Sequence, residues 1–111
     1  MEDEARRRVL AVREDALRTV AELDRRIHDV VTARADANSD DEHDPEGATL
    51  AFERSQADAI RAAALRRLDD AEQAMRRLDS GEYGRCAVCG EPIPEGRLEA
   101  RPLTDRCVRH A

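Results

Sequence analysis

The sequence lacks lysine and tryptophan altogether and contains very few aromatic residues. Aromatics make up 2% of the 111 residues, with a single Phe and a single Tyr. So little bulky apolar surface argues against a large globular core. No apolar run is long enough to span a membrane, and the acidic start Met-Glu-Asp-Glu is unlike the basic start of a signal peptide. We therefore expect no membrane association and a cytoplasmic location.

Positive charge comes only from arginine and is outweighed by acidic residues. The chain has 19 Arg and 25 Asp or Glu, which gives a net charge of −6. Binding to DNA draws on clustered positive charge that neutralises phosphates. We therefore predict no direct sequence-specific DNA binding. The large share of charged residues, 40%, together with abundant Ala and Leu, is typical of long helices with a thin apolar seam.

A first helix is predicted from about Asp3 to Ala35, a stretch with neither Pro nor Gly. Apolar residues recur in it every seven residues, as they do along the seam of a coiled coil. Further apolar residues flank these heptad positions and form a wider apolar stripe along the helix. Arginines and acidic residues fall largely outside this stripe. The heptad positions are Val9, Ala16, Leu23 and Val30, and the flanking positions are Leu10, Leu17, Val20, Ile27 and Val31.

A second helix is predicted from about Pro45 to Ser80, after a polar, acidic turn at about 36–47. Proline suits the first helical position after an Asp44 cap, and Gly81 ends the pattern. The two helices are of similar length and should fold back as a long antiparallel coiled-coil hairpin in a monomer. The alternative is an intermolecular coiled coil. The second heptad series is Leu50, Ala57, Ala64, Ala71 and Leu78, with Ile60, Leu68 and Met75 filling the stripe.

The last quarter of the chain carries two pairs of metal-ligand residues, each with a two-residue gap. Cys86 and Cys89 form the first pair, and Cys107 and His110 form the second. This spacing is typical of a structural zinc site, because each pair faces one ion and the two pairs complete a tetrahedron. We therefore predict one structural Zn²⁺ held by these four residues, without an open position for water.

The three cysteines also allow two interpretations without zinc. They could be unrelated thiols, or two of them could form a redox-active pair, which would need a βαβ context that the pattern does not provide. The odd cysteine count argues against a disulfide framework and favours reduced thiols. No phosphate loop, activated nucleophile or open metal site is evident, so we predict that the protein is not an enzyme. The predicted domains are a hairpin at 1–80 and a zinc finger at 81–111, which makes the fold mainly α.

Three segments around the predicted zinc site resemble the zinc-finger signature of the DksA/TraR family of bacterial transcription regulators. They are Gly-Glu-Tyr-Gly-Arg-Cys at 81–86, Cys-Gly-Glu-Pro-Ile at 89–93 and Arg-Leu-Glu-Ala-Arg-Pro at 97–102. The resemblance is dense over about 81–110, and the upstream hairpin fits the family's architecture. It implies binding to RNA polymerase, with the hairpin entering the secondary channel and its acidic tip near the active site.

At the tip, the resemblance carries over residue by residue. The family's Asp-x-x-Asp-x-Ala motif falls on His43, Glu46 and Ala48, with Asp41 and Asp44 nearby as further carboxylates. The first Asp of the motif is therefore absent. The resemblance makes Asp41, Asp44, Glu46 and Ala48 the candidate partner-binding residues. A competing interpretation treats these acids as a helix cap and a solvated turn.

Two further departures from the family concern metal and alarmone binding. His110 stands where many members have a fourth cysteine. Some members act together with the alarmone ppGpp, and Arg101 matches a basic position near that interface, but Asp70 stands on the helix where another basic residue is expected. We therefore make no prediction of ppGpp dependence. The alternative functions are a zinc-stabilised coiled-coil adapter with another partner and a redox-responsive protein that releases zinc on oxidation.

Overall fold

The structure is a computed structural model that describes the backbone of residues 2–37 and 45–111 and the side chains of residues 2–35 and 47–111. Its elements are α1 (Glu2–Ala37), α2 (Pro45–Ser80), α3 (Glu95–Ala100) and a 3-10 helix, η1 (Val108–His110). Within these residues no strand is present, and one isolated bridge joins Arg85 and Pro92. The mainly helical fold is therefore confirmed. No helix in the described ranges is long and apolar enough to cross a membrane.

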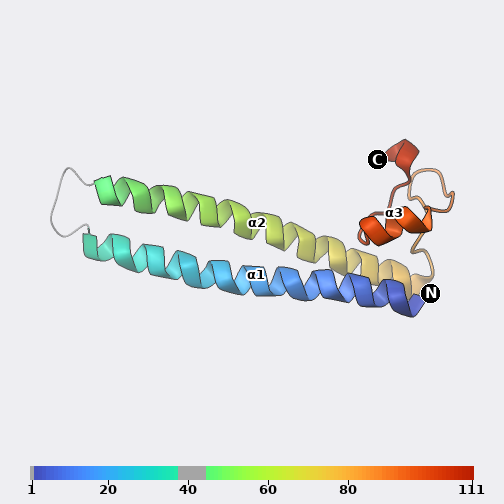
Figure 1. The fold of residues 1–111 in the computed structure, drawn as a ribbon, viewed down its shortest axis with the longest axis horizontal. Helices are drawn as coiled ribbons and strands as arrows, with labels where there is room; N and C mark the ends of the chain where they lie inside the picture. Colours follow the sequence, from blue (N-terminus) through green and yellow to red (C-terminus); the bar gives the residue numbers. More distant parts are fainter. Residues whose placement is uncertain (1, 38–44) are drawn as a thin grey trace. The chain divides into compact units, whose positions relative to one another are not determined.

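The helices α1 and α2 run in opposite directions and form the predicted hairpin (Figure 1). Ion pairs between them show the antiparallel register. The Nη1 atom of Arg6 lies 3.0 Å from the Oδ1 atom of Asp79, and the Nε atom of Arg13 lies 2.6 Å from the Oε1 atom of Glu72. A step of seven residues forward along α1 therefore corresponds to a step of seven residues back along α2. These pairs are part-exposed, so they add little to stability and mainly fix the register.

The seam of the hairpin is made of the two predicted heptad series. Val9, Ala16, Leu23 and Val30 are all buried, as are Ala57, Ala64, Ala71 and Leu78, with exposed fractions from 0% to 6%. Alanine dominates on α2, and its small side chain lets the two backbones approach closely. Such a seam is stabilised by a narrow strip of burial, roughly 25 cal/mol for each Å² of apolar surface removed from water.

The apolar stripe is narrower than the sequence pattern predicts. Leu10, Leu17, Val31 and Ile60 belong to the predicted stripe, but their side chains are 38–45% exposed. The reason is geometric, because a two-helix hairpin covers one face of each helix and leaves the flanking positions open. Phe52, on α2, is also mostly exposed at 66%, which makes it a surface residue.

The chain divides into two compact units. One consists of Met1–Asp15 and Arg67–Ala111, and the other of Ala16–Arg66. The first unit therefore combines residues 81–111, here called the zinc-binding segment, with the beginning of α1 and the end of α2. The predicted division at residue 80 remains a prediction.

Side chains from the zinc-binding segment pack on the helices within the first unit. Tyr83 and Leu103 lie against a cluster that includes Val9 and Leu78, and Tyr83 also packs on a second cluster of Ile93, Leu98 and two cysteines. The Tyr83 hydroxyl donates to the carbonyl of Pro102 at 2.7 Å. Tyr83 thus links the two apolar clusters of this unit.

Local structure after Ser80 follows from glycine and proline. Gly81 has a φ of +78°, and its amide donates to the carbonyl of Leu78, which closes the end of α2. The sequence predicts a tight turn at 92–96 and a returning segment at 97–102. The structure instead has the short helix α3, which begins directly after Pro94. The side chain of Leu98, within this helix, is buried.

Candidate metal centre

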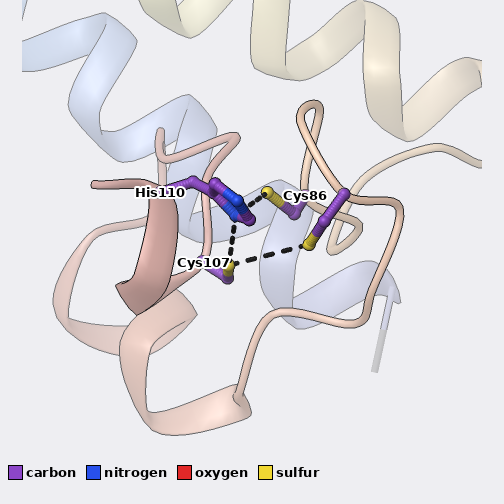
Figure 2. Close-up of side chains that lie close together, drawn as sticks. Cys86, Cys107 and His110 are labelled. Carbon is purple, nitrogen blue, oxygen red and sulfur yellow. Dashed lines mark hydrogen bonds between the residues drawn. The ribbon is translucent and has the colours of Figure 1, made fainter.

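The four predicted zinc ligands converge at one point. The Nδ1 atom of His110 lies 3.2 Å from the Sγ of Cys107 and 3.7 Å from the Sγ of Cys86, and the Sγ of Cys89 lies 3.8 Å from that of Cys107. All four ligand atoms lie within 4.8 Å of one another. Figure 2 shows Cys86, Cys107 and His110 pointing toward one another.

Two tight backbone turns bring these side chains together. In the first, the amide of Gly90 donates to the carbonyl of Cys86 at 2.9 Å, and the amide of Cys86 donates to the carbonyl of Glu91. Gly90 has a φ of +77°, which glycine adopts without a steric penalty. In the second turn, the amide of His110 donates to the carbonyl of Cys107 at 3.0 Å at the start of η1.

A backbone contact joins the two halves of the site. The amide of Ala87 donates to the carbonyl of Asp105 at 2.8 Å. This contact sets the first turn against the segment that leads into Cys107. Cys86 and Cys107 are buried, Cys89 is exposed and His110 is partly exposed, so one side of the cluster faces solvent.

The environment favours the thiolate, which is the form that binds metal, at Cys86 and Cys107, whereas burial and the neighbouring thiols raise the pKa of Cys89. A hydrogen bond from the backbone N–H of Cys107 is the main cause that lowers the pKa of the Cys86 thiol to about 6, and amides in the first turn add to it. The hydrogen bond with His110 lowers the pKa of Cys107, and the same contact raises the pKa of His110. Amide donors to a metal-binding sulfur are the support that such sites need.

The donor set and its spacing fit zinc. A tetrahedron with zinc–sulfur distances of about 2.3 Å has sulfur–sulfur edges of about 3.8 Å. The distance between Cys89 and Cys107 matches that edge at 3.8 Å, and the two distances from His110, 3.2 and 3.7 Å, lie close to it. With four protein ligands such a site has no open position, as structural zinc sites do.

The candidate tip residues are described only in part. Asp41 and Asp44 lie outside the described residues. Glu46 lies in the first turn of α2, but its side chain is outside the described part. Ala48 is exposed on α2. Their role at the tip therefore remains a prediction.

The alarmone-related positions lie on one surface of the first unit. Arg101, Asp70 and Arg67 line a pocket of about 350 Å³, together with Val12 and Thr104. The pocket thus has an acidic residue among its basic ones. The structure adds no reason to predict ppGpp dependence.

Sequence reasoning missed the residues that attach the zinc-binding segment to the helices. The guanidinium nitrogens of Arg8 on α1 lie 3.8 Å from a carboxylate oxygen of Glu95 and 3.5 Å from one of Glu99, both on α3. They also lie 3.3 Å from a carboxylate oxygen of Glu4. Its side chain is 20% exposed. The heptad pattern places Arg8 next to the seam but gives no sign of partners so distant along the chain.

Comparison with known proteins identifies the zinc-binding segment. Residues 81–109 match the model of the prokaryotic dksA/traR C4-type zinc finger. The match ends one residue before His110, the fourth member of the cluster. The family match and the four-residue cluster together support one structural zinc.

Curated relatives match over short stretches. The RNA polymerase-binding transcription factor DksA of Haemophilus influenzae is 46% identical over 37 residues, and that of Caulobacter vibrioides is 51% identical over 37 residues. Each match covers 33% of this chain and 26% of the relative, so it spans about a quarter of their length. The uncharacterised YteA of Bacillus subtilis is 37% identical over 71 residues, which are 64% of this chain and 30% of that protein.

A solved structure matches nearly the whole chain. The transcription factor DksA2 from Pseudomonas aeruginosa has a TM-score of 0.58 and 28% identity, over 98% of this chain and 82% of that one. The hairpin and the zinc-binding segment are therefore similar in fold to a DksA protein.

Proposed function

We propose that the chain is a member of the DksA/TraR family and a transcription regulator that binds RNA polymerase. The match of residues 81–109 to the family's zinc finger carries this proposal. The similarity of the fold to DksA2 over 98% of the chain supports it. The partner is the one that the curated DksA relatives bind according to their names. Such a protein acts in the cytoplasm and acts by binding rather than by catalysis.

In this proposal, Cys86, Cys89, Cys107 and His110 are the zinc ligands, and the zinc has a structural role. Three thiolates and a neutral imidazole around Zn²⁺ have a net charge near −1, which the backbone amides at the sulfurs help to stabilise. The zinc fixes the first turn of the finger against the second. It thereby holds Tyr83 and Leu103 against the helices.

We further propose that the hairpin enters the secondary channel of the polymerase. Its tip, with Asp41, Asp44, Glu46 and Ala48, would lie near the active site and alter the stability of promoter complexes. The exposure of Ala48 on α2 is compatible with a contact there. The net charge of −6 favours a protein partner over direct binding to promoter DNA.

Substitutions at the tip test this function. Asp44→Asn combined with Glu46→Gln removes two charges, and we expect polymerase binding to be nearly unchanged while the effect on transcription in vitro is lost. The matched control is Asp3→Asn with Glu22→Gln, which removes two charges from exposed positions on α1. Equal transcriptional activity of the tip variant and the control would refute the tip mechanism.

A second candidate function is that of a coiled-coil adapter which associates with itself or with another protein. Leu10, Leu17 and Val31 favour it, because they share one heptad position on α1 and are 38–42% exposed. If the chain associates with itself through Leu10, Leu17 and Val31, the molar mass measured by light scattering should rise with protein concentration. A monomer at high concentration would count against it.

A further inference from the structure

A small pocket lies where the start of α1, the end of α2 and the zinc finger meet, within the first compact unit. Its volume is about 250 Å³. Apolar side chains form much of its wall, among them Ala5, Leu78, Ile93 and Leu98. Ligand pockets usually measure about 300–1,000 Å³, so this one is better matched to a single long side chain than to a cofactor.

The charges around this pocket are mainly negative. Glu2 and Glu95 line it, and so does Arg8. The guanidinium of Arg8 already lies within 3.3–3.8 Å of three carboxylates, those of Glu4, Glu95 and Glu99. Glu2 adds a further carboxylate to the wall of the pocket. The pocket therefore favours a cationic occupant and disfavours an anion.

The wall of the pocket also contains an aromatic side chain. Tyr83 lines it, and the hydrogen bond from its hydroxyl to the carbonyl of Pro102, 2.7 Å long, fixes the ring. A planar guanidinium stacks on such a ring and pairs with carboxylates at its edge, which an ammonium group does less well. Arginine is also among the residues that contribute most to binding at protein interfaces.

We propose that this pocket receives an arginine side chain of a partner protein. The proposal rests on the proposed function in taking RNA polymerase as that partner. The aliphatic part of the arginine would pack against Leu78 and Leu98, and its guanidinium would lie over Tyr83 between Glu2 and Glu95. The zinc finger would thus bind the polymerase by charge and shape at the base of the hairpin, away from its tip.

The pocket itself is tested with arginine amide as the probe and the zinc-loaded, full-length chain at low salt. We expect arginine amide to shift the NMR signals of Gly81, Tyr83 and Gly84. Citrulline amide, which has the same shape without the charge, should shift them much less. Glu2→Gln with Glu95→Gln should reduce the shifts by about fivefold. Equal shifts with citrulline amide, or an unchanged response of the double variant, would overturn the proposal.

Binding to polymerase tests the choice of partner. The same double variant should bind RNA polymerase about tenfold more weakly. Its control is Glu82→Gln with Glu91→Gln, which removes two charges from exposed positions of the zinc-binding segment. The affinity of this control for polymerase should stay within about twofold of that of the wild type. Equal weakening in both variants would show a general charge effect and overturn the proposal. If the wild-type chain does not bind polymerase, the proposed function fails, and the arginine amide result still decides the pocket.

Discussion

At the scale of single residues, His110 is the most distinctive feature of the zinc site. We predict that it takes the place of the fourth cysteine of a C4-type finger, and its Nδ1 atom lies close to the sulfurs of Cys86 and Cys107. An imidazole is neutral where a thiolate is charged, so the loaded site has one negative charge fewer than a site with four thiolates.

Removal of the imidazole should weaken zinc binding. Residues that only support a ligand typically contribute 10–100-fold in metal affinity, so we expect His110→Ala to cost at least about 100-fold. His110→Cys should retain tight binding, because it restores the C4 set. Competition with a chromophoric chelator measures both. Arg109→Ala is the control, since Arg109 is exposed beside His110, and equal affinity of the two alanine variants would exclude His110 as a ligand.

Zinc affinity should fall as the solution is acidified. The pKa of Cys86 is lowered to about 6, that of Cys107 is also lowered, and that of His110 is raised. Above about pH 6 the Cys86 thiol is ionised and protons compete with metal mainly at Cys89, whose pKa is raised. Below that pH they compete at Cys86 and at His110 as well. We expect the logarithm of the affinity to fall by more than one for each pH unit below this point. A flat profile there would contradict the ligand assignment.

At the scale of elements, the seam of the hairpin depends on small residues of α2. Ala71 is completely buried opposite α1, near Val9 and Ala74. A larger side chain at this position forces the backbones apart, whereas the same change on the outer face meets only solvent. Alanine at the seam therefore sets the distance between the helices as well as contributing helix propensity.

Overpacking of the seam tests this statement. Ala71→Leu should lower the free energy of unfolding by about 1–3 kcal/mol. Ala63→Leu, at an exposed position of the same helix, should change it by less than about 0.5 kcal/mol. Thermal unfolding followed by circular dichroism compares the two. A stabilised Ala71→Leu variant would mean that the seam has room for a larger side chain.

The helices show how much of the fold can be predicted from the sequence. The heptad positions of both helices are predictable, because burial in a hairpin follows the helical period directly. The pattern overestimates the width of the stripe at Leu10, Leu17 and Ile60, since periodicity does not tell how many neighbours a helix has. It does not predict the helices α3 and η1, because six and three residues are too short for a period to appear. The acidic Glu95 in the first turn is a local signal for α3.

The metal site is predicted more completely than its attachment to the hairpin. The two-residue spacing of Cys86 and Cys89 identifies ligands without knowledge of the fold. The contacts of Arg8 with Glu95 and Glu99, and of Tyr83 with both apolar clusters, join segments distant in sequence. Such contacts depend on how the chain folds back, which spacing alone does not reveal.

At the scale of the whole molecule, the zinc-binding segment is grouped with the helix ends beside it. It forms one compact unit with Met1–Asp15 and the end of α2, while Ala16–Arg66 forms another. Because binding to the folded state stabilises the unit that contains the site, zinc should stabilise the finger and the adjoining helix ends together. A boundary at residue 80 would instead confine the effect to the finger.

Zinc removal distinguishes these two cases. After chelation, we expect hydrogen exchange to rise in 81–111 and also in 67–80 and 2–15, with a smaller rise in 16–66. The expectation follows from the packing of Tyr83 and Leu103 on the cluster of Val9 and Leu78. An increase that stops at residue 80 would support a finger that folds independently of the helices.

The central claim is that this chain acts on RNA polymerase through the tip of its hairpin. A photo-crosslinking residue at Ala48, which is exposed on α2, tests it most directly when the zinc-loaded protein is incubated with purified cognate polymerase. We expect crosslinks to segments at the catalytic centre, competed away by a known secondary-channel factor. No crosslink from a folded, zinc-bound protein, or crosslinks only to the outer surface of the polymerase, would contradict it.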